Sequence, residues 1–152
     1  MQLTHAQKQS IIEDGFVHIP GAVPRVMVDR ALHVINNSVG KGMDRADIRT
    51  MRSQSYCTEL QRVPVITDLL LKTPAWSLAE SAIGEGKIKR PSSGQIALRF
   101  PSLNDPPPPP VPHLDGMHSS HNGVPAGEIR NFTMLVGVAL RDVPTPYSGN
   151  FT

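Results

Sequence analysis

The sequence changes character after Gly86, and this change constrains the fold more than any other feature. Residues 1–86 contain helix start and stop signals, whereas residues 87–152 contain short apolar or alternating stretches separated by prolines and turn residues. Helices followed by a run of strands are typical of α+β domains in which the helices cover one side of a β structure. We therefore expect a single domain over 1–152, with a helical cover over 1–86 and β structure over 87–152.

The helical half carries four start signals. Thr4, followed three residues later by Gln7, forms a capping box, and Gly15 is suited to end that helix in a left-handed conformation. Prolines are expected to open three more helices, at Pro24, Pro64 and Pro74. The helix after Pro24 has an apolar face at helical spacing, formed by Val28, Ala31, Leu32 and Ile35.

Strands are predicted over residues 16–19, 87–90, 95–100 and 132–140. Residues 95–100 alternate between two faces, as expected of a half-buried strand, whereas residues 132–140 are apolar at nearly every position. A strand that is apolar throughout is covered on both faces, as in closed or two-sheet structures. The expected fold is mainly β: a mostly antiparallel barrel or jelly roll with a helical N-terminal cover.

Five consecutive prolines occupy residues 106–110. Such a run favours an extended polyproline II conformation. It suits a stiff loop between two strands, and the alternative is a ligand for SH3 or WW domains. Its position between predicted strands favours the loop.

His113-Leu114-Asp115 is the segment that carries chemistry. Residues i and i+2 of an extended segment point the same way, so His113 and Asp115 are able to reach one ion. Two imidazoles and one carboxylate are the protein ligands of non-haem Fe(II) oxygenases. The tripeptide alone also fits a surface loop with a solvated aspartate.

Composition excludes several classes of protein. The formal charge is +2 and the basic residues are scattered, whereas a nucleic-acid surface usually shows a basic stripe. The lone Cys57 excludes an internal disulfide and fits a reducing compartment. No stretch approaches the roughly 20 apolar residues of a membrane helix. We expect a cytoplasmic protein that binds neither nucleic acid nor membrane.

The sequence resembles the phytanoyl-CoA dioxygenase family over nearly its whole length. The similar stretches follow the family's order: residues 3–7, 14–17 and 19–21 near the N-terminus, 95–101 (QIALRFP) before the metal motif, 112–116 (PHLDG) at the motif, and 135–142 with 148–152 after it. An ordered match is more specific than the tripeptide, and it favours a metal site at His113 and Asp115.

The resemblance implies a double-stranded β-helix, the cupin-like jelly roll, and an oxidoreductase that uses Fe(II), dioxygen and 2-oxoglutarate. Such enzymes hydroxylate a C–H bond, here of a small-molecule or acyl substrate. By position, Gln95, Arg99 and Thr133 resemble residues that contact 2-oxoglutarate in relatives, and each also fits a polar strand residue that faces a loop.

The family's distal iron-binding histidine, and the arginine that binds the far carboxylate of 2-oxoglutarate, are expected beyond Thr152. The β-helix is therefore expected to be incomplete at its C-terminus, with open strand edges that promote self-association. His118 and His121 lie in a loop rich in serine, asparagine and glycine, and are expected to line a substrate entrance or face water. The alternative function is that of an inactive relative acting as a binding or scaffold protein.

Overall fold

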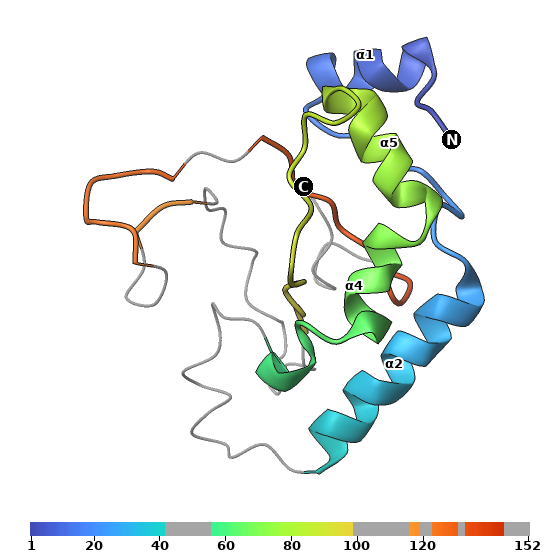
Figure 1. Ribbon diagram of the computed structural model, residues 1–152, viewed down its shortest axis with the longest axis vertical. Helices are drawn as coiled ribbons and strands as arrows, with labels where there is room; N and C mark the ends of the chain where they lie inside the picture. The colour runs from blue at the N-terminus through green and yellow to red at the C-terminus, as the bar shows by residue number, and fades with distance from the viewer. Residues whose placement is uncertain (42–55, 99–115, 119–122, 131–132, 145–152) are drawn as a thin grey trace.

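The computed structural model describes residues 1–41, 56–98, 116–118, 123–130 and 133–144. Within these ranges the helices are α1 (His5–Glu13), α2 (Arg25–Gly40), the short 3-10 helix η2 (Thr58–Leu60), α4 (Pro64–Leu71) and α5 (Pro74–Ile83). Helix α2 packs against α4, and α4 contacts α5. Figure 1 shows α1 lying beside α5, at the opposite end of the helical layer from the C-terminal end of α2. None of the described helices has the length and apolar character needed to cross a membrane.

The predicted capping box at the start of α1 is confirmed. The backbone N–H of Gln7 donates to Thr4 Oγ1 over 3.2 Å, and the backbone N–H of Thr4 donates to Gln7 Oε1 over 2.9 Å. Gly15 follows the helix with a φ of 81°, a conformation that glycine adopts without steric cost. No residue of α1 is buried. The segment is held instead by Leu3, which is buried and whose N–H donates to Ser81 Oγ of α5 over 3.0 Å.

The other predicted helices form with small changes at their ends. Pro64 and Pro74 are the first residues of α4 and α5, as expected, and Gly84 follows the last turn of α5. Pro24 is the residue before α2, not its first helical residue. On the predicted apolar face of α2, Val28, Ala31 and Ile35 are buried and Leu32 is half-buried.

The hydrophobic core lies between the helices and two non-helical segments. Its buried members are Ala31, Ile35, Tyr56, Cys57, Ile66, Leu69 and Ile96. Val138 and Leu140 of the C-terminal part are partly buried and pack against it. Cys57 has a left-handed φ of 49° and precedes η2, so this cysteine is a packing residue of the core at a tight turn.

The expectation of a mainly β jelly roll, or double-stranded β-helix, is wrong for the described residues. They contain no sheet, and their only β pairing is an isolated antiparallel bridge between Met117 and Ile129. The predicted strands at 16–19 and 87–90 are not strands, and neither are the described parts of the other two, residues 95–98 and 133–140. Residues 99, 100 and 132 lie outside the described ranges. The expected open sheet edges are therefore not formed in this part of the chain.

The segment at 95–98 shows why the prediction failed. Ile96 is buried and Leu98 half-buried, whereas Gln95 and Ala97 are exposed, so the predicted alternation of faces is correct. The backbone, however, bonds to a turn and not to a strand. The N–H of Tyr56 donates to the Ile96 carbonyl oxygen over 2.8 Å, and the N–H of Gly94 donates to that of Gln61 over 2.9 Å. Alternation predicts which side is buried, but the pairing partner depends on contacts distant in sequence.

The apolar stretch at 133–140 fails in a different way. Leu135 is 66% exposed and Val136 is 40% exposed, although an all-apolar strand is expected to be covered on both faces. Val138 and Leu140 are the residues of this stretch that pack against the helical core. The stretch therefore covers the core with part of its length and does not enter a sheet.

Candidate functional site

The five predicted site residues divide into two groups. His113 and Asp115, the predicted metal ligands, and Arg99 lie outside the described residues. Gln95 and Thr133, the other two predicted 2-oxoglutarate contacts, are described, and both are exposed to solvent. Among the described residues, no hydrogen bond joins the side chains of Gln95 and Thr133.

The residue directly after the His-x-Asp tripeptide has a tightly defined environment. Gly116 has a φ of 82°, and its carbonyl oxygen accepts a hydrogen bond from the N–H of Arg130 over 2.8 Å. A Cβ atom built on Gly116 would overlap the carbonyl oxygen of Arg130. Glycine is therefore required here for two reasons, the left-handed backbone and the close approach of a second backbone segment.

The neighbouring residues of Gly116 and Arg130 are paired as well. Met117 and Ile129 form the isolated antiparallel bridge, and Val124, between the two segments in sequence, is buried. Pro125 and Glu128 close a turn in which the Glu128 N–H donates to the Pro125 carbonyl oxygen over 3.1 Å. Backbone contacts with Ile129 and Arg130 thus hold Gly116 and Met117, the residues directly after the predicted metal motif.

His118 also belongs to this anchored segment. Its ring nitrogen Nδ1 lies 2.5 Å from the carbonyl oxygen of Val124. A carbonyl oxygen only accepts hydrogen bonds, so Nδ1 carries the proton, and in the neutral ring Nε2 is left with its lone pair. The side chain is exposed, and this contact orients its ring.

The resemblance implies an Fe(II) ion held by two imidazoles and one carboxylate. Among the residues that the structure describes, no group of three or more His, Cys, Asp or Glu side chains is arranged to hold a metal ion. The predicted ligands His113 and Asp115 lie outside that search. An imidazole and a carboxylate are two of the three ligand types that a non-haem Fe(II) site uses, so the chemistry of this donor pair fits iron.

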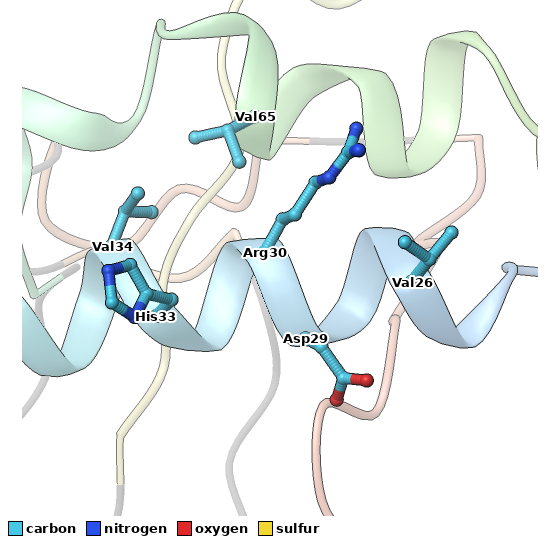
Figure 2. A pocket seen from close by; sticks show the side chains of 6 residues that line it. All are labelled: Val26, Asp29, Arg30, His33, Val34 and Val65. Carbon is cyan, nitrogen blue, oxygen red and sulfur yellow. The ribbon is translucent and has the colours of Figure 1, made fainter.

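A shallow groove of about 590 Å³ lies elsewhere, between α2 and α4. Figure 2 shows Arg30 reaching from α2 towards α4, with Val65 of α4 pointing back and Asp29 directed away. Asp29 forms an ion pair with Arg25, at 2.8 Å. The described lining is Val26, Asp29, Arg30, His33, Val34 and Val65, which includes neither Gln95 nor Thr133.

One carboxylate in the described structure has a shifted pKa. The hydroxyl of Ser38, at the end of α2, donates to the carboxylate of Glu59 in η2. This hydrogen bond, with smaller contributions from the Glu59 backbone N–H and the charge of Lys41, lowers the pKa of Glu59. The Ser38–Glu59 hydrogen bond links the C-terminal end of α2 to η2, and both residues are remote in sequence from the His-x-Asp tripeptide.

Comparison with known proteins adds no further assignment. No protein-family model, curated protein or solved structure matches this chain.

Sequence reasoning missed two features of the segment after the metal motif. The pairing of Gly116 with Arg130 and the hydrogen bond from His118 to Val124 were not predicted. The sequence signals for these two features were weak. They were a glycine directly after the tripeptide and two further glycines, Gly123 and Gly127, later in the loop. In the structure both of these later glycines have positive φ values.

Proposed function

We propose that the protein is a Fe(II)- and 2-oxoglutarate-dependent oxygenase that hydroxylates a small-molecule or acyl substrate. The observation that carries the proposal is the segment 112–116 (PHLDG), which stands in the order typical of the phytanoyl-CoA dioxygenase family. The donor chemistry of His113 and Asp115 fits iron. The close packing of Gly116 against Arg130 supports a constrained backbone directly beside these two residues.

His113 and Asp115 would hold the iron. The imidazole would bind as a neutral donor and the carboxylate would supply negative charge. When bound, iron would supply the oxidising chemistry, in which one oxygen atom of dioxygen enters 2-oxoglutarate, which becomes succinate and CO2, and the other hydroxylates a substrate C–H bond. The chain's own contribution is to bind and orient these groups.

Gln95, Thr133 and Arg99 would contact the cosubstrate. The amide of Gln95 and the hydroxyl of Thr133 are able to donate hydrogen bonds to a carboxylate, and the guanidinium of Arg99 carries the complementary charge. The described side chains of Gln95 and Thr133 are both exposed to solvent.

The test is Fe(II)-dependent conversion of 2-oxoglutarate to succinate by the purified full-length protein, with and without the change Asp115→Ala. We expect conversion by the wild-type protein to require Fe(II) and to be lost in the variant. Asp142→Ala is the matched control, since Asp142 is an exposed aspartate of the same half of the chain. Equal conversion by wild type and Asp115→Ala would overturn the proposal. A folded protein that binds 2-oxoglutarate without converting it would support the alternative of an inactive binding protein.

A further inference from the structure

We infer that the groove between α2 and α4 is a binding site for a small amphipathic carboxylate. Arg30 binds the carboxylate group, and valine side chains contact the apolar chain attached to it. The inference does not rest on the proposed function, because the described lining of the groove contains none of the residues assigned to iron or 2-oxoglutarate.

Three valines give the groove its apolar surface. Val26 and Val34 lie on α2, and Val65 of α4 points back towards this helix (Figure 2). Residues 26, 30 and 34 are four positions apart, so they share one face of α2. Val26 is 56% exposed, and Val34 and Val65 are half-buried. Apolar surface is therefore left uncovered on both sides of Arg30, and an apolar ligand that covered it would be stabilised by the hydrophobic effect.

The charge in the groove is positive and uncompensated. Arg30 reaches from α2 towards α4 and forms no ion pair with any residue that the structure describes. Asp29, the acidic residue of the described lining, is directed away, and its carboxylate accepts a hydrogen bond from Nε of Arg25 over 2.8 Å. His33, almost one turn after Arg30, adds a ring that is able to donate a hydrogen bond.

These features together define the chemistry of the ligand. A guanidinium binds a carboxylate through two parallel N–H···O bonds, so Arg30 favours a carboxylate head group. The valines beside it favour an apolar chain attached to that head group. The volume of about 590 Å³ lies in the range of small-molecule sites. A medium-chain fatty carboxylate combines one anionic head with a single apolar chain and so matches the groove.

The test is the binding of octanoate, measured by isothermal titration calorimetry, with octan-1-ol as a neutral probe of the same chain length. Arg30→Gln removes the charge at an exposed position, so the variant should fold as wild type does. Because hydrogen bonds to charged groups are among the stronger ones, we expect its dissociation constant for octanoate to rise by about tenfold or more. Binding of octan-1-ol should not change. Arg90→Gln is the matched control, since Arg90 is an exposed arginine outside the lining.

A second variant tests the apolar part of the site. Val26→Asp replaces an exposed valine in the first turn of α2, where a negative charge is compatible with the helix. It should weaken the binding of both probes, and that of octanoate more strongly because the two carboxylates repel each other. Ile12→Asp makes a similar change at a residue of α1 that is 84% exposed, and should bind both probes as wild type does.

A further measurement uses the wild-type chain and does not depend on how a variant folds. Octanoate should shift the NMR amide resonances of Arg30, His33 and Val65. Shifts confined to other residues, equal octanoate affinity in wild type and a folded Arg30→Gln variant, or no binding of octanoate would each overturn the inference. None of these measurements involves iron or 2-oxoglutarate, so each of these results would leave the proposed function unaffected.

Discussion

The backbone of Gly116 packs directly on the carbonyl group of Arg130. The Arg130 N–H donates to the Gly116 carbonyl oxygen over 2.8 Å, and no room remains for a side chain on the glycine. This contact fixes the course of the chain as it leaves the His-x-Asp tripeptide. It links the motif to a segment that lies more than ten residues later in the sequence.

Gly116→Ala should therefore open this contact. Gly127→Ala is the matched control, because Gly127 has a similar φ of 85° and nothing within 4 Å of an added Cβ. Both changes carry the cost of a left-handed alanine, about 1–2 kcal/mol, and Gly116→Ala adds the overlap with Arg130. We expect hydrogen exchange of the Arg130 amide to be faster in Gly116→Ala than in Gly127→Ala. Equal exchange rates in the two variants would contradict the described packing.

Ile35→Ala should destabilise the helical core. Ile35 is only 2% exposed and lies where α2 faces the core. Truncation of a buried isoleucine removes apolar burial and leaves a cavity, which costs about 2–5 kcal/mol of the free energy of unfolding. Ile12→Ala is the control, because Ile12 is 84% exposed, and it should change that free energy by no more than about 0.5 kcal/mol. Urea denaturation followed by circular dichroism measures both, and similar midpoints for the two variants would contradict the core assignment.

Ser38→Ala should raise the pKa of Glu59 towards its ordinary value of 4.5, because the Ser38 hydroxyl is the largest cause of the lowered pKa. A carboxylate whose pKa is lower in the folded state contributes stability above its unfolded-state pKa, and this contribution is lost as the pH falls through the folded-state pKa. The variant should therefore lose less stability than wild type on acidification below pH 4.5. NMR titration of the Glu59 side chain gives the pKa, with Ser92→Ala as a control at an exposed serine. An unchanged Glu59 pKa in Ser38→Ala would rule out the hydrogen bond as its cause.

Gln95→Ala should weaken the binding of 2-oxoglutarate while iron binding persists. A hydrogen bond to a charged group contributes about 1.5–3 kcal/mol, so the dissociation constant should rise by about tenfold or more. Gln9→Ala, on the exposed surface of α1, provides the control. A 2-oxoglutarate titration with no difference between the two variants would remove Gln95 from the site.

The helices could be predicted from the sequence because their signals are local. The capping box of Thr4 and Gln7, the prolines that open α4 and α5, and the spacing of Val28, Ala31 and Ile35 all act within a few residues. Each signal acts either on the terminal backbone groups of its own helix or on the face that the helix buries.

The structure of the described residues after Gly86 could not be predicted in the same way. Alternation at 95–98 correctly identified Ile96 as buried, but its backbone partner is Tyr56, 40 residues earlier. The apolar stretch at 133–140 indicated burial on both faces, yet Leu135 is mostly exposed. Side-chain patterns carry information on burial, whereas strand pairing depends on long-range contacts that a pattern does not specify. For the candidate site, the glycine after the tripeptide was visible in the sequence, but its partner Arg130 was not.

The most direct test of the central claim is whether Fe(II) and 2-oxoglutarate bind in a linked manner. The cosubstrate chelates the metal in this class of enzyme, so iron bound by His113 and Asp115 should strengthen 2-oxoglutarate binding, and linkage requires the reverse effect to be equal. The measurement is anaerobic calorimetric titration of 2-oxoglutarate into the chain with and without saturating Fe(II). We predict affinity at least about tenfold higher with iron, a coupling of about 1.4 kcal/mol or more, and loss of this gain in Asp115→Ala. Equal affinity with and without iron, or an unchanged gain in Asp115→Ala, would contradict the account.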